Sequence, residues 1–428
     1  MTLTKTPVRG MKDILPEEMA LRDYTIGLIR DTYKTFGFTP VETPAVEHIE
    51  NLTSKQGGEN ESLIFRIMKR GEKLSLDGAA SAEDLTDSGL RYDLTVSLCR
   101  FYANNLDKLP SPFKALQIGS VWRADKPQKG RYRQFTQCDI DVLGEGSMLA
   151  EIELITATAT LLGRLGFSGF TVRINHRRLL KAMADSCAFP EGSREKVFII
   201  LDKMDKIGLS GVSDELLAAG LPQAAVDAYL EYFSVEHNSS NNPFEAWAAK
   251  LAPEMDAAAD GEVSAAIEDM RTILTCMEAV RDSVPATFEL VFDPTLVRGM
   301  GYYTGPIFEI SLKEFGGSVA GGGRYDQLVG NFTSLQTPAC GFSIGFERII
   351  SVLMDRGYTV PSKETKTAFL MEKGLEKEEL YDMLLEAGRL RREGITVLVT
   401  VRSKNSKYQR ERLEKDGYTE IRSFYRKR

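Results

Sequence analysis

The sequence predicts an α+β protein with a strand-rich core, a helical insertion and a small α/β unit toward the carboxyl end. Strand-like segments dominate up to about residue 144, and they return between residues 288 and 344. Residues 177–283, which lie between them, show an almost entirely helical pattern. A polar linker at 361–366 precedes a β-α-β-α-β pattern. The chain has 428 residues, a length that favours two or three domains.

The first element is an amphipathic helix over residues 16–37. Ile26, Ile29 and Tyr33 recur at helical spacing, and Gly37 ends the helix. The same periodicities predict a helix at 149–165 and strands at 170–174, 288–292, 307–312 and 340–344. In the terminal unit we expect strands at 368–371, 395–401 and 419–424, separated by helices at 377–392 and 403–416.

Composition excludes several kinds of chemistry. The chain has three histidines and five cysteines, with no HExxH and no CxxC spacing. It therefore lacks the ligands of a multi-histidine metal site or a zinc knuckle, and a disulfide framework is not expected. Free cysteines fit a reducing cytosol, the polar N-terminus carries no secretory signal, and no stretch approaches about 18 apolar residues. We therefore expect a cytoplasmic protein with no membrane partner.

A basic loop between two expected strands is the most informative segment. The loop spans residues 124–133, and Pro127 and Gly130 shape it. One carboxylate, Asp125, stands among five cations: Arg123, Lys126, Lys129, Arg131 and Arg133. So much charge of one sign indicates a polyanionic ligand, although the net charge of the whole chain is −7.

The strand after this loop divides its side chains between two faces. At period two, Cys138, Ile140 and Val142 form an apolar face. The other face carries Phe135, Gln137, Asp139 and Asp141. An aromatic ring, an amide and two carboxylates in line indicate a lined pocket, with a solvated hairpin face as the alternative. Asp139 has a second interpretation, in which it only supports the strand.

Three glycine-rich clusters add weaker signals. Residues 296–305 place Arg298 and a tyrosine pair among glycines, which allow a close approach of backbone to ligand. Residues 321–326 are expected to open a helix whose free N–H groups suit an anion. Residues 340–348 predict a strand that runs into a helix.

Arg348 falls in the first turn of that helix, where the macrodipole disfavours a cation unless an anion is bound. The neighbouring Glu347 offers a purely structural explanation for the same placement. The sequence contains no GxxxxGK[ST], so a nucleoside triphosphate would be held without a P-loop.

Taken together, these segments resemble the class II aminoacyl-tRNA synthetases, and among them the histidyl-tRNA synthetase family. Residues 8–17 are similar to an N-terminal signature of that family, and residues 37–44 to motif 1, with Pro44 as its proline. Residues 121–141 resemble motif 2 and residues 341–348 motif 3. Residues 296–305 and 321–326 resemble the two histidine-specific signatures. The resemblance spans about residues 7–355.

The resemblance implies an architecture and partners. It implies a class II antiparallel-sheet core at 1–176 and 286–360, a helical insertion domain at 177–285, and a truncated anticodon-binding-like α/β domain at 367–428. Motif 1 implies a homodimer. The terminal domain is shorter than that of the family, yet residues 402–428 carry ten basic and four acidic residues. This segment suits RNA phosphate, with a solvated basic tail as the alternative.

The implied activity is that of a histidine–tRNA ligase with L-histidine, ATP and tRNA(His) as substrates. In the family, the histidine carboxylate attacks ATP to give histidyl-adenylate, and the 3′ end of the tRNA then takes the histidyl group. By resemblance, Arg123 and Arg298 are the catalytic cations, each bridging phosphate and carboxylate. Phe135 would stack on adenine with Arg348 on the opposite face, and Asp125 and Arg131 would grip a nucleotide that carries Mg²⁺. No prosthetic group and no protein metal centre is implied.

The resemblance also assigns the histidine pocket. Asp93, Thr95 and Gln137 match positions that hold the amino group, and Asp141 and Tyr303 match those that contact the imidazole. Tyr302 helps to build the pocket or serves only packing. The chain departs from the family at Gly301, where an acid is common, and at Met11, where threonine is common. None of its own three histidines is given a role.

Two other functions remain open. One is the catalytically silent, synthetase-like regulatory subunit of ATP phosphoribosyltransferase in histidine biosynthesis. That paralogue usually loses pocket residues, whereas Arg123, Gln137, Asp141, Arg298 and Arg348 are all present here. The other is a synthetase-like ligase that loads something other than tRNA, which the short terminal domain keeps open.

Overall fold

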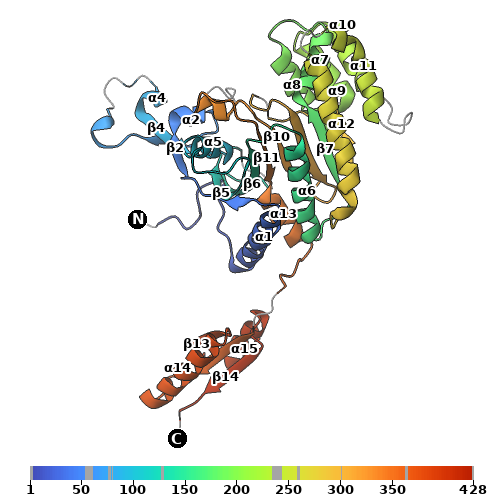
Figure 1. Ribbon diagram of the computed structural model, residues 1–428. Helices are drawn as coiled ribbons and strands as arrows, with labels where there is room; N and C mark the ends of the chain where they lie inside the picture. Colours follow the sequence, from blue (N-terminus) through green and yellow to red (C-terminus); the bar gives the residue numbers. More distant parts are fainter. Residues whose placement is uncertain are drawn as a thin grey trace. The chain divides into compact units, whose positions relative to one another are not determined.

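The computed structural model describes residues 3–53, 61–75, 79, 81–126, 130–233, 243–257, 261–299, 301–361 and 365–426 (Figure 1). The chain divides into two compact units, residues 1–358 and 359–428, which are described separately. Lys129, one of the cations of the basic loop, lies outside the described residues.

An eight-stranded sheet forms the centre of the first unit (Figure 1). Its strands, in spatial order, are β1 (Thr39–Pro40), β5 (Phe113–Trp122), β6 (Gln134–Leu143), β11 (Ala339–Ile344), β10 (Gly317–Arg324), β9 (Pro306–Leu312), β7 (Phe170–His176) and β8 (Phe288–Phe292). Pairing is antiparallel from β5 to β7 and parallel only at the two edges, β1 with β5 and β7 with β8. The antiparallel-sheet core is therefore confirmed.

Strands from before and after the insertion pair directly in this sheet. In β6 and β11, Asp141 lies opposite Gly341 and Asp139 opposite Ser343. The expected apolar face of β6 is also confirmed, because Cys138, Ile140 and Val142 are buried. The polar face of one segment is thereby brought against a segment about 200 residues away.

The expectation that residues 321–326 open a helix is wrong. Residues 321–324 belong to β10, which lies between β9 and β11. Glycine is required here for close packing, since a Cβ on Gly322 would lie 2.0 Å from the carbonyl oxygen of Gly341. A run of glycines has no side chains to alternate between faces, so the strand periodicity is missing from the sequence.

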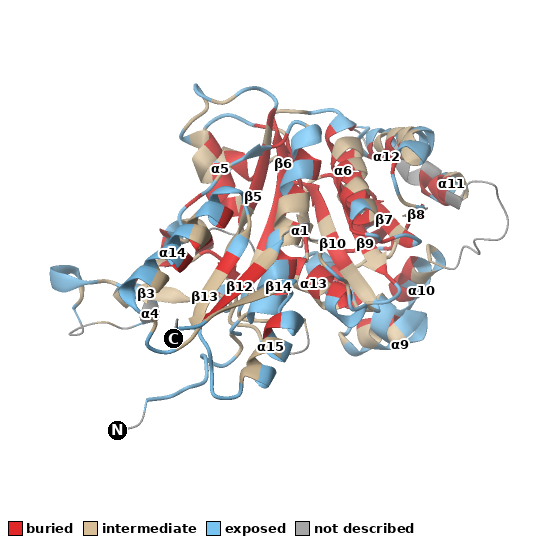
Figure 2. Ribbon diagram, turned by 90° about the horizontal axis from the view of Figure 1, so that it is seen from below, coloured by how far each residue is buried: buried red, intermediate tan, exposed pale blue. Residues whose placement is uncertain are grey.

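Helices cover the sheet and bury its central strands. The expected first helix is α1 (Pro16–Thr35), and the helix expected at 149–165 is α6 (Leu149–Arg164). α6 packs on β11, α13 (Phe346–Asp355) packs on β6, and α1 packs on α6. Figure 2 shows the resulting concentration of buried residues along β5 and β6. The expected strand-to-helix passage at 340–348 is confirmed.

The strand-rich block before residue 144 also contains helices that we did not expect. A three-stranded sheet pairs β2 (Val46–His48) and β3 (Arg66–Met68) with β4 (Thr86–Leu90). Around it lie α2 (Ile49–Thr53), the short η1 (Gly71–Lys73), α4 (Ala82–Leu85) and α5 (Thr95–Ala103). Val96, Cys99 and Tyr102, three residues apart, are buried along one face of α5.

The described residues between 177 and 283 are mainly helical, as expected. They form α7 (Arg177–Ser186), α8 (Arg194–Leu201), α9 (Met204–Ala218), α10 (Gln223–Glu231), α11 (Pro243–Ala257), α12 (Glu262–Val280) and η2 (Arg281–Ser283). The buried His176 joins these helices to the sheet. Its Nδ1 accepts the backbone N–H of Arg178 at 3.0 Å, and its Nε2 lies 3.5 Å from a carboxylate oxygen of Asp269 on α12. Burial lowers the pKa of His176 despite that neighbouring carboxylate.

The second unit has the expected β-α-β-α-β order. Its elements are β12 (Lys366–Met371), α14 (Lys377–Arg392), β13 (Thr396–Val401), α15 (Ser406–Lys415) and β14 (Glu420–Phe424). The three strands are parallel, with β12 in the centre. Phe369, Met383 and Leu390 fill a core on one side of this sheet, and Ala368, Leu370 and Leu413 fill one on the other. In neither unit is any described helix long and apolar enough to cross a membrane.

A buried ion pair fixes α6 to β10. Nε of Arg324 lies 2.7 Å from one oxygen of Glu151, and Nη2 lies 2.8 Å from the other. Both side chains are almost fully buried, at 5% and 0% exposure. Nη2 also donates to the backbone carbonyl of Ser147 at 2.9 Å. Arg324 therefore has a structural partner and does not offer its charge to a ligand.

We expect that Glu151→Ala lowers the free energy of unfolding of the first unit by about 3–5 kcal/mol, because it leaves a guanidinium buried without its counter-ion. Urea unfolding followed by tryptophan fluorescence tests this, since both tryptophans, Trp122 and Trp247, lie in that unit. The double variant Glu151→Ala with Arg324→Met should lose less free energy of unfolding than Glu151→Ala alone. An equal or greater loss of unfolding free energy in the double variant would contradict the argument.

Candidate active site

A cavity of about 310 Å³ opens where β6, β10 and β11 meet the segment that precedes β9. Of the residues that the sequence singled out, the structure brings to its walls Arg123, Asp125, Arg131, Phe135, Gln137, Arg298, Tyr302, Tyr303 and Arg348. A larger cavity of about 1360 Å³ adjoins it on the side of α7 and α8 and shares Arg131, Arg298, Tyr302, Tyr303 and Arg348. The proposed nucleotide residues therefore share one cavity.

Two of the arginines are oriented by backbone carbonyl groups and aromatic rings. Nε of Arg123 donates to the carbonyl of Tyr92 at 2.9 Å, and its guanidinium lies 5.3 Å from the centroid of the Phe135 ring. Nη1 of Arg348 donates to the carbonyl of Ser318 at 2.5 Å, and its guanidinium lies over Phe315. Neutral partners of this kind orient a cation while leaving its charge uncompensated.

The position of Arg348 is not explained by Glu347. The Glu347 carboxylate pairs with Arg22 of α1, at 2.7 and 2.9 Å, and accepts the backbone N–H of Thr136 at 3.1 Å. Burial lowers the pKa of Arg348, and the positive charges of Arg298 and Arg131 lower it further. Guanidinium groups that repel one another at one cavity indicate an anionic ligand.

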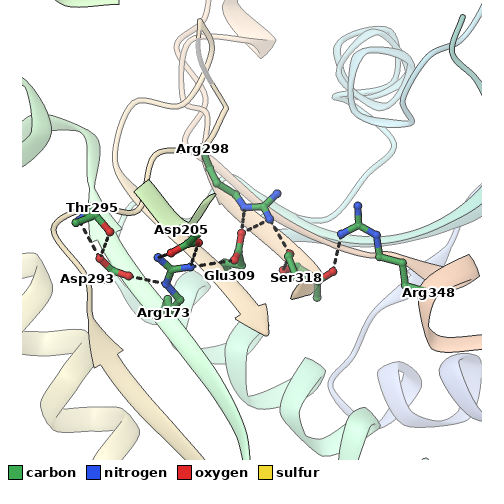
Figure 3. A network of polar contacts seen from close by, with 9 residues as sticks. Arg173, Asp205, Asp293, Thr295, Arg298, Glu309, Ser318 and Arg348 are labelled. Atoms are coloured by element: carbon green, nitrogen blue, oxygen red, sulfur yellow. Dashed lines mark hydrogen bonds and ion pairs between the residues drawn. The ribbon is translucent and has the colours of Figure 1, made fainter. Parts of the chain in front are cut away.

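Arg298 is held by side chains of two strands (Figure 3). Its Nε donates to Oε2 of Glu309 on β9 at 2.5 Å, its Nη2 contacts the same oxygen, and Nη2 donates to Oγ of Ser318 at 2.6 Å. The guanidinium lies flat against β10, where a Cβ on Gly321 would come within 3.0 Å of its Cζ. The glycine of β10 thus makes room for the arginine.

Asp125 contributes a carboxylate to the wall of the 310 Å³ cavity. Nε of Arg131 lies 3.8 Å from Oδ2 of Asp125, and the Arg131 side chain is half exposed. This loose ion pair leaves the guanidinium accessible from the cavity.

The buried carboxyl groups of β6 lie beneath the arginines. Tyr325 donates its hydroxyl to Oδ1 of Asp141 at 2.5 Å, whereas Oδ2 is buried with no hydrogen-bond partner among the described residues. Burial raises the pKa of Asp141 to about 7, although the Tyr325 hydroxyl opposes the shift. Gly341 permits this arrangement, because a Cβ there would lie 2.0 Å from Oδ1. Asp141 therefore has one oxygen available for a hydrogen-bond donor.

Gln137 is oriented by its neighbours on β6 and β11. Its Nε2 donates to Oγ of Ser343 at 3.0 Å and to Oδ2 of Asp139 at 3.3 Å, and Ser343 donates to Oδ1 of Asp139 at 2.5 Å. Burial, followed by the charge of Asp141, raises the pKa of Asp139 well above its usual range. The Gln137 carbonyl oxygen is buried without a partner in the described structure, so it is free to accept a hydrogen bond. Asp139 orients Gln137 as well as supporting the strand.

Asp93 and Thr95 lie at the start of α5. Oδ1 of Asp93 accepts the backbone N–H of Val96 at 3.2 Å, and Thr95 is the first residue of the helix. Burial raises the pKa of Asp93, and the nearby Arg123 opposes this shift. Neither residue lines the cavity itself.

The two tyrosines form one wall as a pair. The ring centroids of Tyr302 and Tyr303 are 4.3 Å apart, and burial raises the pKa of both hydroxyls. A Cβ on Gly299 would lie 1.9 Å from the Tyr303 ring, so only glycine fits there. Gly301, where the family often has an acid, has φ +107°, a conformation that L-residues rarely adopt.

Four contributors to the site were not identified from the sequence: Glu309, Ser318, Tyr325 and Ser343. Tyr325 and Ser343 lie within the glycine-rich clusters, but their partners are distant in the sequence. Glu309 had a usable signal, because it is a single acid inside the apolar strand at 307–312. A lone charge in a buried strand requires a partner.

The mainly antiparallel sheet, with an arginine-bearing hairpin and a strand-to-helix motif around one cavity, is the catalytic core of a class II aminoacyl-tRNA synthetase. A sequence model of the family described as "Histidyl-tRNA synthetase" matches residues 10–349. The chain belongs to that family, which confirms the resemblance seen in the motifs.

Relatives with known names agree with this assignment. The chain is 46% identical over 355 residues to the histidine–tRNA ligase of Leifsonia xyli subsp. xyli, covering 81% of this chain and 80% of the relative. It is 37% identical over 423 residues to that of Aeropyrum pernix, covering 96% and 88%. The histidyl-tRNA synthetase structure from Nostoc sp. PCC 7120 has a TM-score of 0.76 and 27% identity, covering 97% of this chain and 90% of that chain.

A second solved structure supports the fold alone. It is described as an ATP phosphoribosyltransferase regulatory subunit/histidyl-tRNA synthetase from Bacillus halodurans C. The TM-score is 0.76, the identity is 19%, and both chains are covered completely.

The raised pKa of Asp141 predicts a pH-dependent stability. This carboxyl titrates near 3.8 in the unfolded chain and at about 7 when folded, so the folded state binds its proton more tightly. Ionisation therefore destabilises the fold as pH rises through this interval. Relative to Asp141→Asn, the wild type should lose unfolding free energy between about pH 4 and 7 and level off above that. Urea unfolding followed by tryptophan fluorescence measures both proteins, and a difference independent of pH would contradict the assignment.

Proposed function

We propose that this protein is a histidine–tRNA ligase that activates L-histidine with ATP and then transfers the histidyl group to the 3′ end of tRNA(His). The observation that carries this proposal is the convergence of Arg123, Arg131, Arg298 and Arg348 on one cavity. Asp141 does not line this cavity, but its Oδ2 is buried without a hydrogen-bond partner among the described residues. The names of the relatives support the same activity.

In the first step, a carboxylate oxygen of histidine forms a bond to the α-phosphorus of ATP, and the bond to pyrophosphate breaks. Negative charge on the α-phosphate oxygens increases in the transition state, where fixed cations provide most of the stabilisation. Arg123 and Arg298 are the proposed cations, because hydrogen bonds to Tyr92 and Ser318 already orient them. Each bridges the phosphate and the histidine carboxylate.

The nucleotide would be held by the basic loop and α13. Phe135 provides a ring for adenine, Arg348 covers the opposite face, and Asp125 and Arg131 contact the ribose-phosphate part. The described residues contain no group of three or more His, Cys, Asp or Glu able to hold a metal ion. Mg²⁺ would be held mainly by ATP phosphate oxygens, whose charge it would neutralise, and Asp125 is the carboxylate of the basic loop that could contribute to holding it.

Histidine would be recognised at both ends. The unpaired Oδ2 of Asp141 would accept a hydrogen bond from an imidazole N–H, with Tyr303 beside the ring. Asp93, Thr95 and the unpaired carbonyl oxygen of Gln137 would bind the ammonium group. An amino acid without a ring N–H would leave the Asp141 oxygen buried and unpaired. Such a loss discriminates by about 10⁴–10⁵ in sites of this type, so an editing site is unnecessary.

We further propose roles for the rest of the chain. Residues 177–285 act as an insertion domain and residues 367–428 as a shortened anticodon-binding-like domain, and motif 1 in α1 and β1 supports a homodimer. The regulatory-subunit alternative is disfavoured, since the full set of pocket arginines and carboxylates lines or underlies one cavity.

Histidine-dependent exchange of pyrophosphate into ATP tests the first step, and charging of tRNA(His) tests the second. We expect both activities. Absence of exchange would contradict the ligase and favour the regulatory alternative, whereas exchange without charging would favour a ligase with another acceptor.

Arg298→Ala should lower the exchange rate by roughly 1,000-fold, because it removes a cation fixed at the reacting phosphate. Its fold should be retained, since Arg298 lies outside helix and strand, its side chain is one-third exposed, and Arg173 still contacts Glu309. Exchange at the wild-type rate would show that Arg298 is not catalytic.

Gly321→Ala should lower exchange by roughly ten- to a hundredfold, because the new methyl group would displace the Arg298 guanidinium. Gly317→Ala on the same strand is the matched control. Its Cβ would meet only Phe315 at 3.9 Å, an ordinary contact. Similar losses in both variants would indicate a general effect on β10 and would contradict the displacement of Arg298.

A further inference from the structure

We propose that Glu309 is a positioning residue for Arg298, and that Arg173, anchored by Asp293 and Asp205, holds Glu309 in place. The inference rests on the proposed function, in which Arg298 acts on the reacting phosphate. It adds a support for that arginine which none of the sequence motifs contains (Figure 3).

Arg298 depends on side-chain contacts for its orientation. It lies outside helix and strand, in the segment between β8 and β9. One carboxylate oxygen of Glu309 accepts hydrogen bonds from both Nε and Nη2 of Arg298. The hydroxyl oxygen of Ser318 accepts a further hydrogen bond from Nη2 at 2.6 Å. Glu309 itself is on a central strand and is 8% exposed, so its own position is rigid.

The two oxygens of Glu309 are assigned to different arginines. Oε2 accepts hydrogen bonds from Arg298, whereas Oε1 lies 3.5 Å from Nη1 of Arg173 on the neighbouring strand β7. This arrangement fixes the plane of the carboxylate.

Arg173 is in turn held from two further elements. Its Nε donates to Asp293, just after β8, at 2.5 Å, and its Nη1 and Nη2 donate to Asp205 on α9 at 2.7 and 3.2 Å. Thr295 holds Asp293 through its backbone N–H and its hydroxyl, at 2.8 and 2.6 Å. Acids and arginines therefore alternate from the first turn of α9 to Arg298, and they join the helical insertion to the active site.

The kinetic test compares Glu309→Ala with the wild type in ATP–pyrophosphate exchange. We expect kcat to fall by roughly a hundredfold, because a displaced Arg298 no longer meets the charge that develops in the transition state. KM for histidine and ATP should change much less than kcat. Glu314→Ala is the matched control, since it breaks another ion pair, with Arg356 at 2.7 Å, at the end of β9 outside the cavity. We expect that control to leave exchange unchanged.

A double-variant cycle separates positioning from a general structural effect. If Glu309 acts through Arg298, Glu309→Ala should lower kcat by a far smaller factor in an Arg298→Lys background than in the wild type. If Glu309 were merely structural, its substitution would lower kcat by the same factor in both backgrounds. That result would overturn the proposal. Arg173→Met should reduce kcat in the same direction, and Asp205→Asn should do so less, because Asp293 still holds Arg173.

A crystal structure of Glu309→Ala gives an answer that does not depend on activity. The Arg298 guanidinium should leave Oγ of Ser318 or occupy several positions. An unchanged Arg298 would overturn the positioning role, whatever the exchange assay shows. Conversely, absence of histidine-dependent exchange in the wild type, together with a displaced Arg298 in the variant, would contradict the proposed function and leave the positioning role supported.

Discussion

Mutual repulsion among four guanidinium groups is the constraint on which the site depends. Arg123, Arg131, Arg298 and Arg348 share one cavity, and the charges of its neighbours lower the pKa of Arg348 beyond the effect of burial. Two of them are held by neutral carbonyl groups, and the others face carboxylates that are loosely paired or shared. Positive charge is thereby concentrated while only part of it is neutralised, by Glu309 and Asp125, and this favours binding and reaction at a polyphosphate.

The sheet builds the floor of the site because it brings polar side chains from distant segments together. β6 supplies Gln137 and Asp141, β11 supplies Ser343, and Tyr325 follows β10. Glycines at 321, 322 and 341 let side chains and strands approach to distances that no Cβ permits. Packing and chemistry are therefore not separable in this core: the residues without side chains determine where the charged ones can lie.

The sequence predicted those parts whose signal is local. The arginine-bearing hairpin, the two faces of β6, the first turn of α13 and the terminal β-α-β-α-β unit each follow from periodicity or charge within a short window. The prediction of a helix start at residues 321–326 was wrong, because the glycines of β10 carry no periodicity. The helix α5 was not expected, because strand-like residues surround it. Partners such as Glu309 for Arg298 and Tyr325 for Asp141 escaped prediction, since only the sheet order places them together. Conversely, the structural explanation of Arg348 through Glu347 could be excluded only by finding Arg22 on that carboxylate.

The direct pairing of β6 with β11 has a consequence for synthesis on the ribosome. β6 can pair with β5 as soon as both are made, but the partner on its other edge follows about 200 residues later, after the whole insertion. At 5–20 residues per second, that interval is roughly 10–40 s. During this time the nascent chain presents a bare strand edge, the kind of surface on which aggregation begins. Charged side chains make an edge strand a poorer template for other chains, and β6 carries Asp139 and Asp141 along the strand that waits for β11.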